Sequence, residues 1–290
     1  MLRHAQRARG RLGGPSPYPT AAARAGRTLG AAFIVLAFTA PLLLLVGGSL
    51  RRPGSPPPTR PELVPDRVTT EGYATALELG GLLRASVNSL VVVAVAVPVG
   101  VLVASLAGFA LTRVPRRIAG VVAAASLGAL MVPTTALLVP RFALFRAVGW
   151  TDTLFPLMAP ALIGTSPLYP LVYYLAFRAV PTELYDVCRL EDVSPMRTWW
   201  RVAMPLARPV TAAIAALTFV VTWANFLDPL VYVYDRERFT LPLALRSLAT
   251  LDPPNAPVFL AGAVLATAPA LLVFAMAQRT FLGHPGRTRR

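Results

Sequence analysis

The stretch PTELYDVCRLEDVSPMRTWWRVAMPL, residues 181–206, decides the fold because it places many charges between two long apolar segments. Its pattern predicts two short helices joined by a tight corner. Thr182 is suited to the N-cap of the first helix, with the carboxylate of Glu183 in its first turn. Ser194 followed by Pro195 is typical of the start of a second helix, with serine as N-cap and proline at the first helical position.

The two predicted helices have different faces. Leu184, Val187 and Cys188 recur at i, i+3 and i+4 in the first helix, where they form a narrow apolar row. The second helix has an apolar, aromatic face made of Met196, Trp199, Trp200 and Ala203. Arg197 and Arg201 occupy its other face. This pattern is typical of an interfacial helix, with rings at headgroup depth and arginines toward water or lipid phosphate.

The stretch resembles the cytoplasmic signature loop of ABC importer permeases, which runs E-L-x-E-A-A-R-I-D-G-A-S and closes further on with L-P-L. Asp186 stands where the family usually has glutamate, and Asp192 stands where it usually has glycine. In the family, this loop is the coupling helix that docks on a cytoplasmic ATPase. The resemblance therefore assigns ATPase coupling to Glu183, Leu184, Asp186, Val187, Cys188, Arg189, Asp192, Ser194 and Pro205.

The composition indicates a polytopic membrane protein. Of 290 residues, 55% are hydrophobic and 14% charged, and the mean hydropathy is +0.59. Several apolar runs exceed the roughly 18 residues that suggest a bilayer span. We expect one all-α domain with six spans, at 29–50, 85–111, 118–140, 153–177, 210–234 and 256–277. The expected division is a basic arm (1–28), a permease domain (29–282, with its core at 85–282 and the coupling loop at 181–206) and a tail (283–290).

The distribution of arginine predicts the orientation. Six spans put both ends and the 181–206 stretch on one side, which carries 18 of the 28 arginines, against nine on the other side. By the positive-inside rule that side is cytoplasmic, in a bacterial inner membrane. The basic arm is expected to attract anionic lipid. A secretory signal is the alternative for the N-terminus, but the apolar run at 29–50 exceeds the usual signal core.

Several kinds of chemistry are disfavoured. Every basic residue behind the net charge of +15 is arginine, so a Walker-type phosphate loop, which needs lysine, is excluded. The single cysteine, Cys188, rules out an internal disulfide, and His4 and His284 lie in the polar tails. We expect no catalytic site, metal or cofactor, and no nucleic acid partner.

Candidate residues for a translocation path lie in TWANFLDPL, residues 222–230. Asp228 is the only acid in the predicted spans, and a charge within a bilayer should face protein or a wet cavity. The segment resembles the sugar-permease pattern W-N-E-F-x-x-P-L, so Trp223 and Asn225 join Asp228 as candidates. Alternatives stay open: an interfacial carboxylate for Asp228, and helix packing for Trp223 and Asn225.

The whole resemblance covers residues 85–282 and includes Asn88-Ser89-Leu90 and the terminal 278–281 QRTF. It points to the smaller permease type of the carbohydrate importers related to the maltose system. It implies four kinds of partner: a second permease, an ATPase dimer, an extracytoplasmic binding protein and a sugar. The alternatives are a permease for peptide, polyamine or phosphate, an ion-driven secondary transporter, and a membrane scaffold.

Overall fold

A computed structural model describes residues 21–56, 62–251 and 255–282. All regular structure in these ranges is helical, which confirms the predicted all-α class. Four stretches are long and apolar enough to cross a membrane, namely Gly26–Ser49, Leu82–Leu111, Phe155–Arg178 and Ala256–Gln278. Two further pairs of helices qualify only if each bent pair counts as one span, which gives up to six. The predicted number of six therefore stays a prediction.

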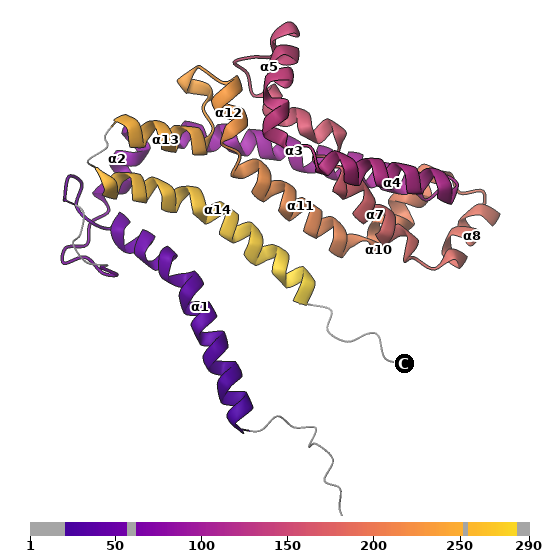
Figure 1. Cartoon of the computed structure of the whole chain (residues 1–290), viewed down its shortest axis with the longest axis horizontal. Helices are drawn as coiled ribbons and strands as arrows, with labels where there is room; N and C mark the ends of the chain where they lie inside the picture. The colour runs from indigo at the N-terminus through magenta and orange to yellow at the C-terminus, as the bar shows by residue number, and fades with distance from the viewer. Residues whose placement is uncertain (1–20, 57–61, 252–254, 283–290) are drawn as a thin grey trace, which may run out of the picture.

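The long helix α3 (Leu82–Leu111) runs through the middle of the molecule, with α7 (Leu168–Arg178) and α11 (Arg208–Trp223) packed along it (Figure 1). The outer helix α1 (Ala21–Ser49) lies against α14 (Ala256–Leu282). Small residues on α3 allow the close packing with α7, because they let two helix backbones approach. A Cβ placed on Gly108 would lie 2.5 Å from the Tyr173 Cβ.

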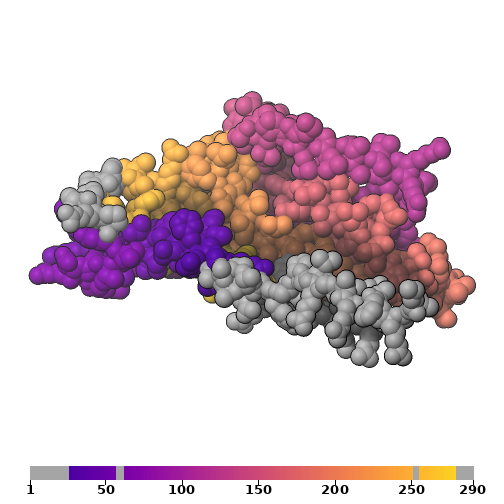
Figure 2. All heavy atoms as spheres, turned by 60° about the horizontal axis from the view of Figure 1, so that its bottom comes forward, coloured from indigo at the N-terminus to yellow at the C-terminus, as the bar shows by residue number. Residues whose placement is uncertain are grey.

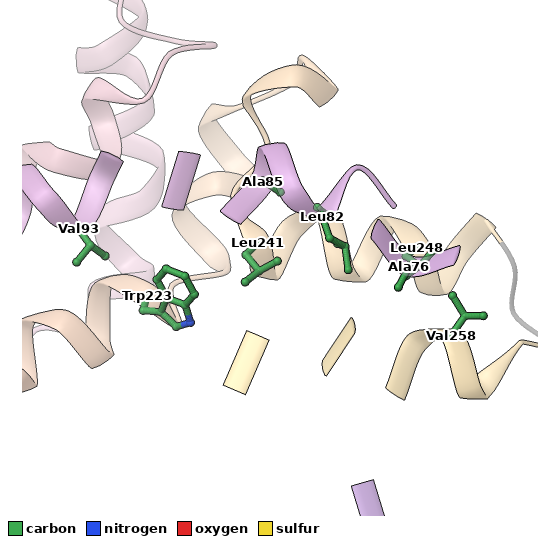
Figure 3. Close-up of a cluster of buried hydrophobic side chains, with 9 residues drawn as sticks. Ala76, Leu82, Ala85, Val93, Trp223, Leu241, Leu248 and Val258 are labelled. Atoms are coloured by element: carbon green, nitrogen blue, oxygen red, sulfur yellow. The ribbon is translucent and has the colours of Figure 1, made fainter. Parts of the chain in front are cut away.

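The end of the molecule at the left of Figure 1 is closed by α2 (Glu71–Leu79) and α13 (Leu241–Leu251). Figure 3 shows the apolar cluster there, to which α2, α3, α11, α13 and α14 contribute. The Asn88 amide nitrogen donates to the carbonyls of Glu237 and Phe239, at 2.8 and 3.0 Å, and the Leu241 N–H donates to Ser89 Oγ at 2.8 Å. The Asn88-Ser89 pair thus holds the start of α13, a helix that the sequence analysis does not predict.

The predicted third span, 118–140, is not one straight helix. The structure has α4 (Arg116–Leu130), the short η1 (Thr134–Leu137) and α5 (Leu138–Ala147), with a bend of 88°. The break falls at Pro133, which offers no N–H and disfavours helical backbone at the residue before it. Therefore α5 turns away from α4 and stands out from the body of the molecule (Figure 1).

The predicted fourth and fifth spans are also interrupted. The fourth consists of α6 (Phe155–Met158), η2 (Ala159–Ile163) and α7, with Gly164 and Thr165 at positive φ. In the predicted fifth span, 210–234, α11 ends at Trp223 and α12 (Leu227–Tyr232) begins after a break. A one-turn element, η4 (Arg236–Arg238), follows.

The remaining spans match their predicted positions more closely, with α3 and α14 starting at or near the predicted residues. The helix α1 begins at Ala21, eight residues before the predicted first span. Most of the predicted arm, the predicted tail and both histidines lie outside the described residues.

Candidate coupling surface and translocation site

The signature stretch forms α8 (Thr182–Leu190), α9 (Pro195–Thr198), the π-helical η3 (Trp199–Ala203) and α10 (Met204–Leu206), so the predicted pair of helices with a corner is present. The prediction of Thr182 as N-cap is wrong, because Thr182 is the first helical residue and Pro181 precedes it as N-cap. Ser194 is the N-cap of α9, as predicted. It acts through its carbonyl, which accepts the Thr198 N–H at 2.9 Å, since its side chain makes no capping bond.

The corner between α8 and α9 is made by Asp192, whose φ is 49°. The next N–H, of Val193, donates to the Cys188 carbonyl at 2.8 Å and closes the end of α8. Glycine takes this left-handed backbone without steric cost, and aspartate is among the few other residues that adopt it. Asp192 therefore makes the turn at the position where the signature pattern has glycine.

Helix α8 presents its apolar row to the outside. Leu184 and Val187 are 43% and 57% exposed, Cys188 is half-buried, and no residue of α8 is buried. Tyr185 anchors the helix, since its hydroxyl donates to the Phe177 carbonyl at 2.9 Å. Burial raises the pKa of the Tyr185 phenol. Figures 1 and 2 both place α8 at one end of the molecule, where nothing in the described chain covers its apolar row.

The charged residues of α8 lie beside this row. An exposed ion pair joins Arg189 Nη1 to Asp186 Oδ1 at 3.3 Å. Glu183 lies in the first turn, and its side chain is exposed. Pro205 lies far along the second segment, in α10, so the predicted coupling residues occupy one continuous surface only on α8 and its corner.

The second helical segment differs from the predicted pattern. Trp199 and Ala203 are buried, at 5% and 0% exposed, and pack against the cluster around α7. Met196 and Trp200 instead point outward, at 59% and 64% exposed. The prediction that these four residues share one face is therefore wrong. Residues 199 and 200 diverge because neighbours in a helix are about 100° apart, and the π-helical turn shifts the register.

The candidate translocation residues gather at the break between α11 and α12. The Asn225 side chain replaces helical hydrogen bonds there: its Oδ1 accepts the Asp228 N–H at 3.2 Å, and its Nδ2 donates to Asp228 Oδ2 at 2.9 Å. Pro229 has no N–H to bond back across the break. Trp223 has a packing contact, since its Nε1 donates to the Ala266 carbonyl of α14 at 2.8 Å and its ring stacks on Phe219.

Asp228 is buried and has a cationic partner that the sequence analysis did not identify. Arg141 of α5 places Nη2 3.3 Å from Asp228 Oδ2. The same guanidinium lies over the rings of Tyr232 and Phe145, at 5.6 and 5.9 Å from their centroids. Nothing in a single sequence pairs two residues that are 87 positions apart, so this partner could not be found from the sequence.

A cavity of about 10 Å³ adjoins the break, lined by Ser89, Val92, Leu157, Thr222, Asn225, Pro229 and Thr240. It has room for about one water molecule, and the buried Thr240 hydroxyl beside it has no hydrogen-bond partner among the described residues. A sugar could pass these residues only if the surrounding helices moved. No group of three or more metal-ligating side chains occurs in the described ranges.

A carboxylate fastens the loop before α6 to the chain after α12. Asp152 accepts the N–H groups of Tyr234 and Asp235 at 3.0 and 2.9 Å, and pairs with Arg238 Nη1 at 3.0 Å. These two backbone N–H groups lower the pKa of Asp152 below its ordinary value, with a smaller contribution from Arg238. The Asp152 N–H in turn donates to the Tyr232 carbonyl at 2.7 Å.

Comparison with known proteins identifies the family. Residues 72–281 match the family described as binding-protein-dependent transport system inner membrane component. The chain belongs to this family. It is 30% identical over 195 residues to the lactose transport system permease protein LacG of Rhizobium radiobacter, covering 67% of this chain and 71% of LacG. The chain is thus a transport permease and a multi-pass membrane protein, as the sequence analysis predicts.

A second relative, also a permease, is similar to this chain over a larger share of both sequences. The arabinooligosaccharides transport system permease protein AraQ of Halalkalibacterium halodurans is 28% identical over 258 residues, which are 88% of this chain and 92% of AraQ. The fold is similar to a chain in the crystal structure of a bacterial ABC transporter that imports the acidic polysaccharide alginate. That similarity has a TM-score of 0.73 at 19% identity, and covers 91% of this permease and 99% of that chain.

Proposed function

We propose that this permease is the membrane subunit of an ATP-driven sugar importer and that α8 couples it to a cytoplasmic ATPase. The observation that carries the coupling assignment is the uncovered apolar row of Leu184, Val187 and Cys188 on a helix that touches the rest of the chain through Tyr185. Sugar as the solute is supported by the relatives, which are named for lactose, arabinooligosaccharides and trehalose.

The remaining partners follow from the proposed function. An ATPase dimer binds α8 and hydrolyses ATP, since this chain has no lysine for a phosphate loop. A second permease completes the path, and an extracytoplasmic binding protein delivers the sugar at the end formed by α2 and α13. Both termini and α8 face the cytoplasm, in agreement with the distribution of arginine.

The breaks in the helices provide the moving parts. Closure of the ATPase dimer displaces α8, and the displacement passes through the packed α7–α3–α11 core to the break at 224–226. Asn225 and Asp228 lie at that break and line or border the path in the open state. Trp223 fixes the end of α11 on α14 through its bond to Ala266. Irregular backbone is tolerated at membrane depth where it faces protein or a cavity, which fits this position.

The test replaces the two residues of the exposed ion pair on α8. Asp186→Ala and Arg189→Ala should abolish sugar uptake while the protein stays inserted. An exposed ion pair contributes only about 0–1 kcal/mol, so lost uptake would report lost coupling and not misfolding. Arg117→Ala is the matched control, because Arg117 is an exposed arginine on another helix, and it should leave uptake intact. Full transport by the two α8 variants would refute the coupling assignment.

Purification separates the competing functions. The tagged chain, extracted from its native membrane in mild detergent, should carry with it an ATPase, a second permease and a binding protein. Ligands screened on that binding protein then distinguish sugar from peptide, polyamine or phosphate. Uptake that needs an ion gradient but no ATP would instead favour a secondary transporter, and a chain that purifies alone and carries no solute would favour a scaffold.

A further inference from the structure

The segment of residues 195–206 is oriented across the helix that follows it. The pieces Pro195–Leu206 and Arg208–Trp223 meet at an angle of 84°. Since α11 runs alongside the spanning helix α3 and packs on it, a segment nearly perpendicular to α11 lies close to the plane of the membrane surface. Its buried side, formed by Trp199 and Ala203, packs on the protein core and fixes which face points away.

The outward face of this segment combines two adjacent rows. Met196 and Trp200 form an apolar row and are 59% and 64% exposed. Arg197 and Arg201, also exposed, form a basic row beside it. Residues four apart lie about one helical turn from each other, so the two guanidinium groups can approach one phosphate together. An exposed ring beside paired arginines is the pattern of a surface at lipid headgroup depth.

The two arginines are free to bind an anion. The ion pairs within the described residues are made by Arg84, Arg141, Arg189 and Arg238, so neither Arg197 nor Arg201 is neutralised there. Glu191 and Asp192, in the corner before this segment, form no ion pair with either arginine among the described residues. Two uncompensated positive charges at the membrane surface attract anionic lipid, and arginine is suited to hold a phosphate through parallel hydrogen bonds.

We propose that the face formed by Met196, Arg197, Trp200 and Arg201 binds the headgroup of an anionic phospholipid. The two guanidinium groups hold the phosphate, and Trp200 with Met196 inserts among the upper acyl carbons. Because this segment joins α8 to α11, the bound lipid fixes the height of the coupling helix relative to the membrane surface. The site does not depend on which solute the permease carries.

Lipids that quench tryptophan fluorescence test the site. The full-length chain is placed in lipid nanodiscs that contain brominated phosphatidylglycerol or brominated phosphatidylcholine at equal mole fraction. The signal of Trp200 is the difference between the unmodified chain and Trp200→Phe, a change that removes one exposed ring and leaves the buried Trp199 and Trp223 in place. We expect half-maximal quenching of that signal at a roughly tenfold lower mole fraction of the anionic lipid, and a smaller preference in high salt.

Charge variants identify the residues responsible. Arg197→Gln with Arg201→Gln should make the two brominated lipids quench Trp200 equally. Arg116→Gln with Arg117→Gln removes the same charge from exposed arginines of α4 and should leave the preference unchanged. Equal quenching of the unmodified chain by both lipids, or no quenching of Trp200 by either, would overturn the proposal. Equal losses in the two double variants would also overturn it, since the effect would then be net charge and not a site.

Discussion

Arg141 and Asp228 are 87 positions apart in the sequence, and their side chains meet at 3.3 Å with the carboxylate only 12% exposed. The pair joins α5, which follows the 88° bend after α4, to α12, which follows the break at the end of α11. Asn225 donates a second hydrogen bond to the same carboxylate oxygen. A single ion pair therefore fixes the geometry of two chain breaks relative to each other.

Removing one partner of this pair should destabilise the protein. Asp228→Asn leaves the guanidinium of Arg141 largely buried without a counter-charge, and we expect a loss on the order of 2 kcal/mol in the free energy of unfolding. Asp186→Asn is the matched control, since its ion pair with Arg189 has the same 3.3 Å separation but is 60–66% exposed. It should cost less than about 1 kcal/mol. Thermal unfolding in detergent measures both variants, and equal shifts in Tm would contradict this prediction.

Replacing both partners should cost less than replacing one. Arg141→Met with Asp228→Leu removes the unpaired charge and keeps apolar volume against the Tyr232 ring, so part of the lost stability should return. A double variant less stable than Asp228→Asn would indicate that the guanidinium contributes mainly through its contacts with Phe145 and Tyr232.

The hydrogen bonds that Asp152 accepts from the Tyr234 and Asp235 amides should persist into moderately acidic solution. Because the folded pKa of Asp152 is lowered below its ordinary value of 3.8, its stabilising effect is fully present above about pH 4. That effect is lost as the pH falls through the lowered folded pKa. Hydrogen exchange at the Tyr234 and Asp235 amides, corrected for intrinsic rates, should therefore show constant protection from neutral pH to about pH 4 and loss below it. Protection that declined between pH 7 and pH 5 would contradict the assignment.

Gly108 should tolerate no side chain. A Cβ there would lie 2.5 Å from the Tyr173 Cβ and 2.7 Å from the Pro170 carbonyl oxygen, so Gly108→Ala has to push α7 away from α3. We expect a loss of about 1–3 kcal/mol, seen as a lower Tm in detergent. Gly120→Ala is the matched control, since nothing lies within 4 Å of its added Cβ. Because alanine favours a helix over glycine, Gly120→Ala should be neutral or should stabilise the protein by up to about 1 kcal/mol.

Apolar length and local helix signals predicted much of this fold. Long uncharged runs located α3 and α14 closely, because burial in a membrane requires many consecutive apolar residues. The Ser194-Pro195 pair located the start of α9, because N-cap geometry depends on adjacent residues alone. The signature stretch likewise indicated a surface helix before any contact was known.

Features that depend on distant contacts could not be predicted. The bend near Pro133 and the helix break at 224–226 divide apolar runs that a hydropathy pattern treats as continuous. Asn225 breaks its helix through its own bonds to Asp228, and Asp228 is held by Arg141 from another bend. The inward position of Trp199 and the outward position of Trp200 were also missed, since a π-helical turn changes which residues share a face.

The corner that orients α8 should accept glycine at position 192 and reject valine. The φ of 49° at Asp192 suits glycine and is tolerated by aspartate, whereas a β-branched residue is strained there. Asp192→Gly should keep sugar uptake, and Asp192→Val should reduce it severalfold by opening the Val193–Cys188 hydrogen bond that ends α8. Glu191→Val is the control, because residue 191 has an ordinary φ of −89° and is also exposed. Uptake and membrane insertion are measured together for all three variants. If Asp192→Val transported as well as Asp192→Gly, the left-handed corner would have no part in coupling.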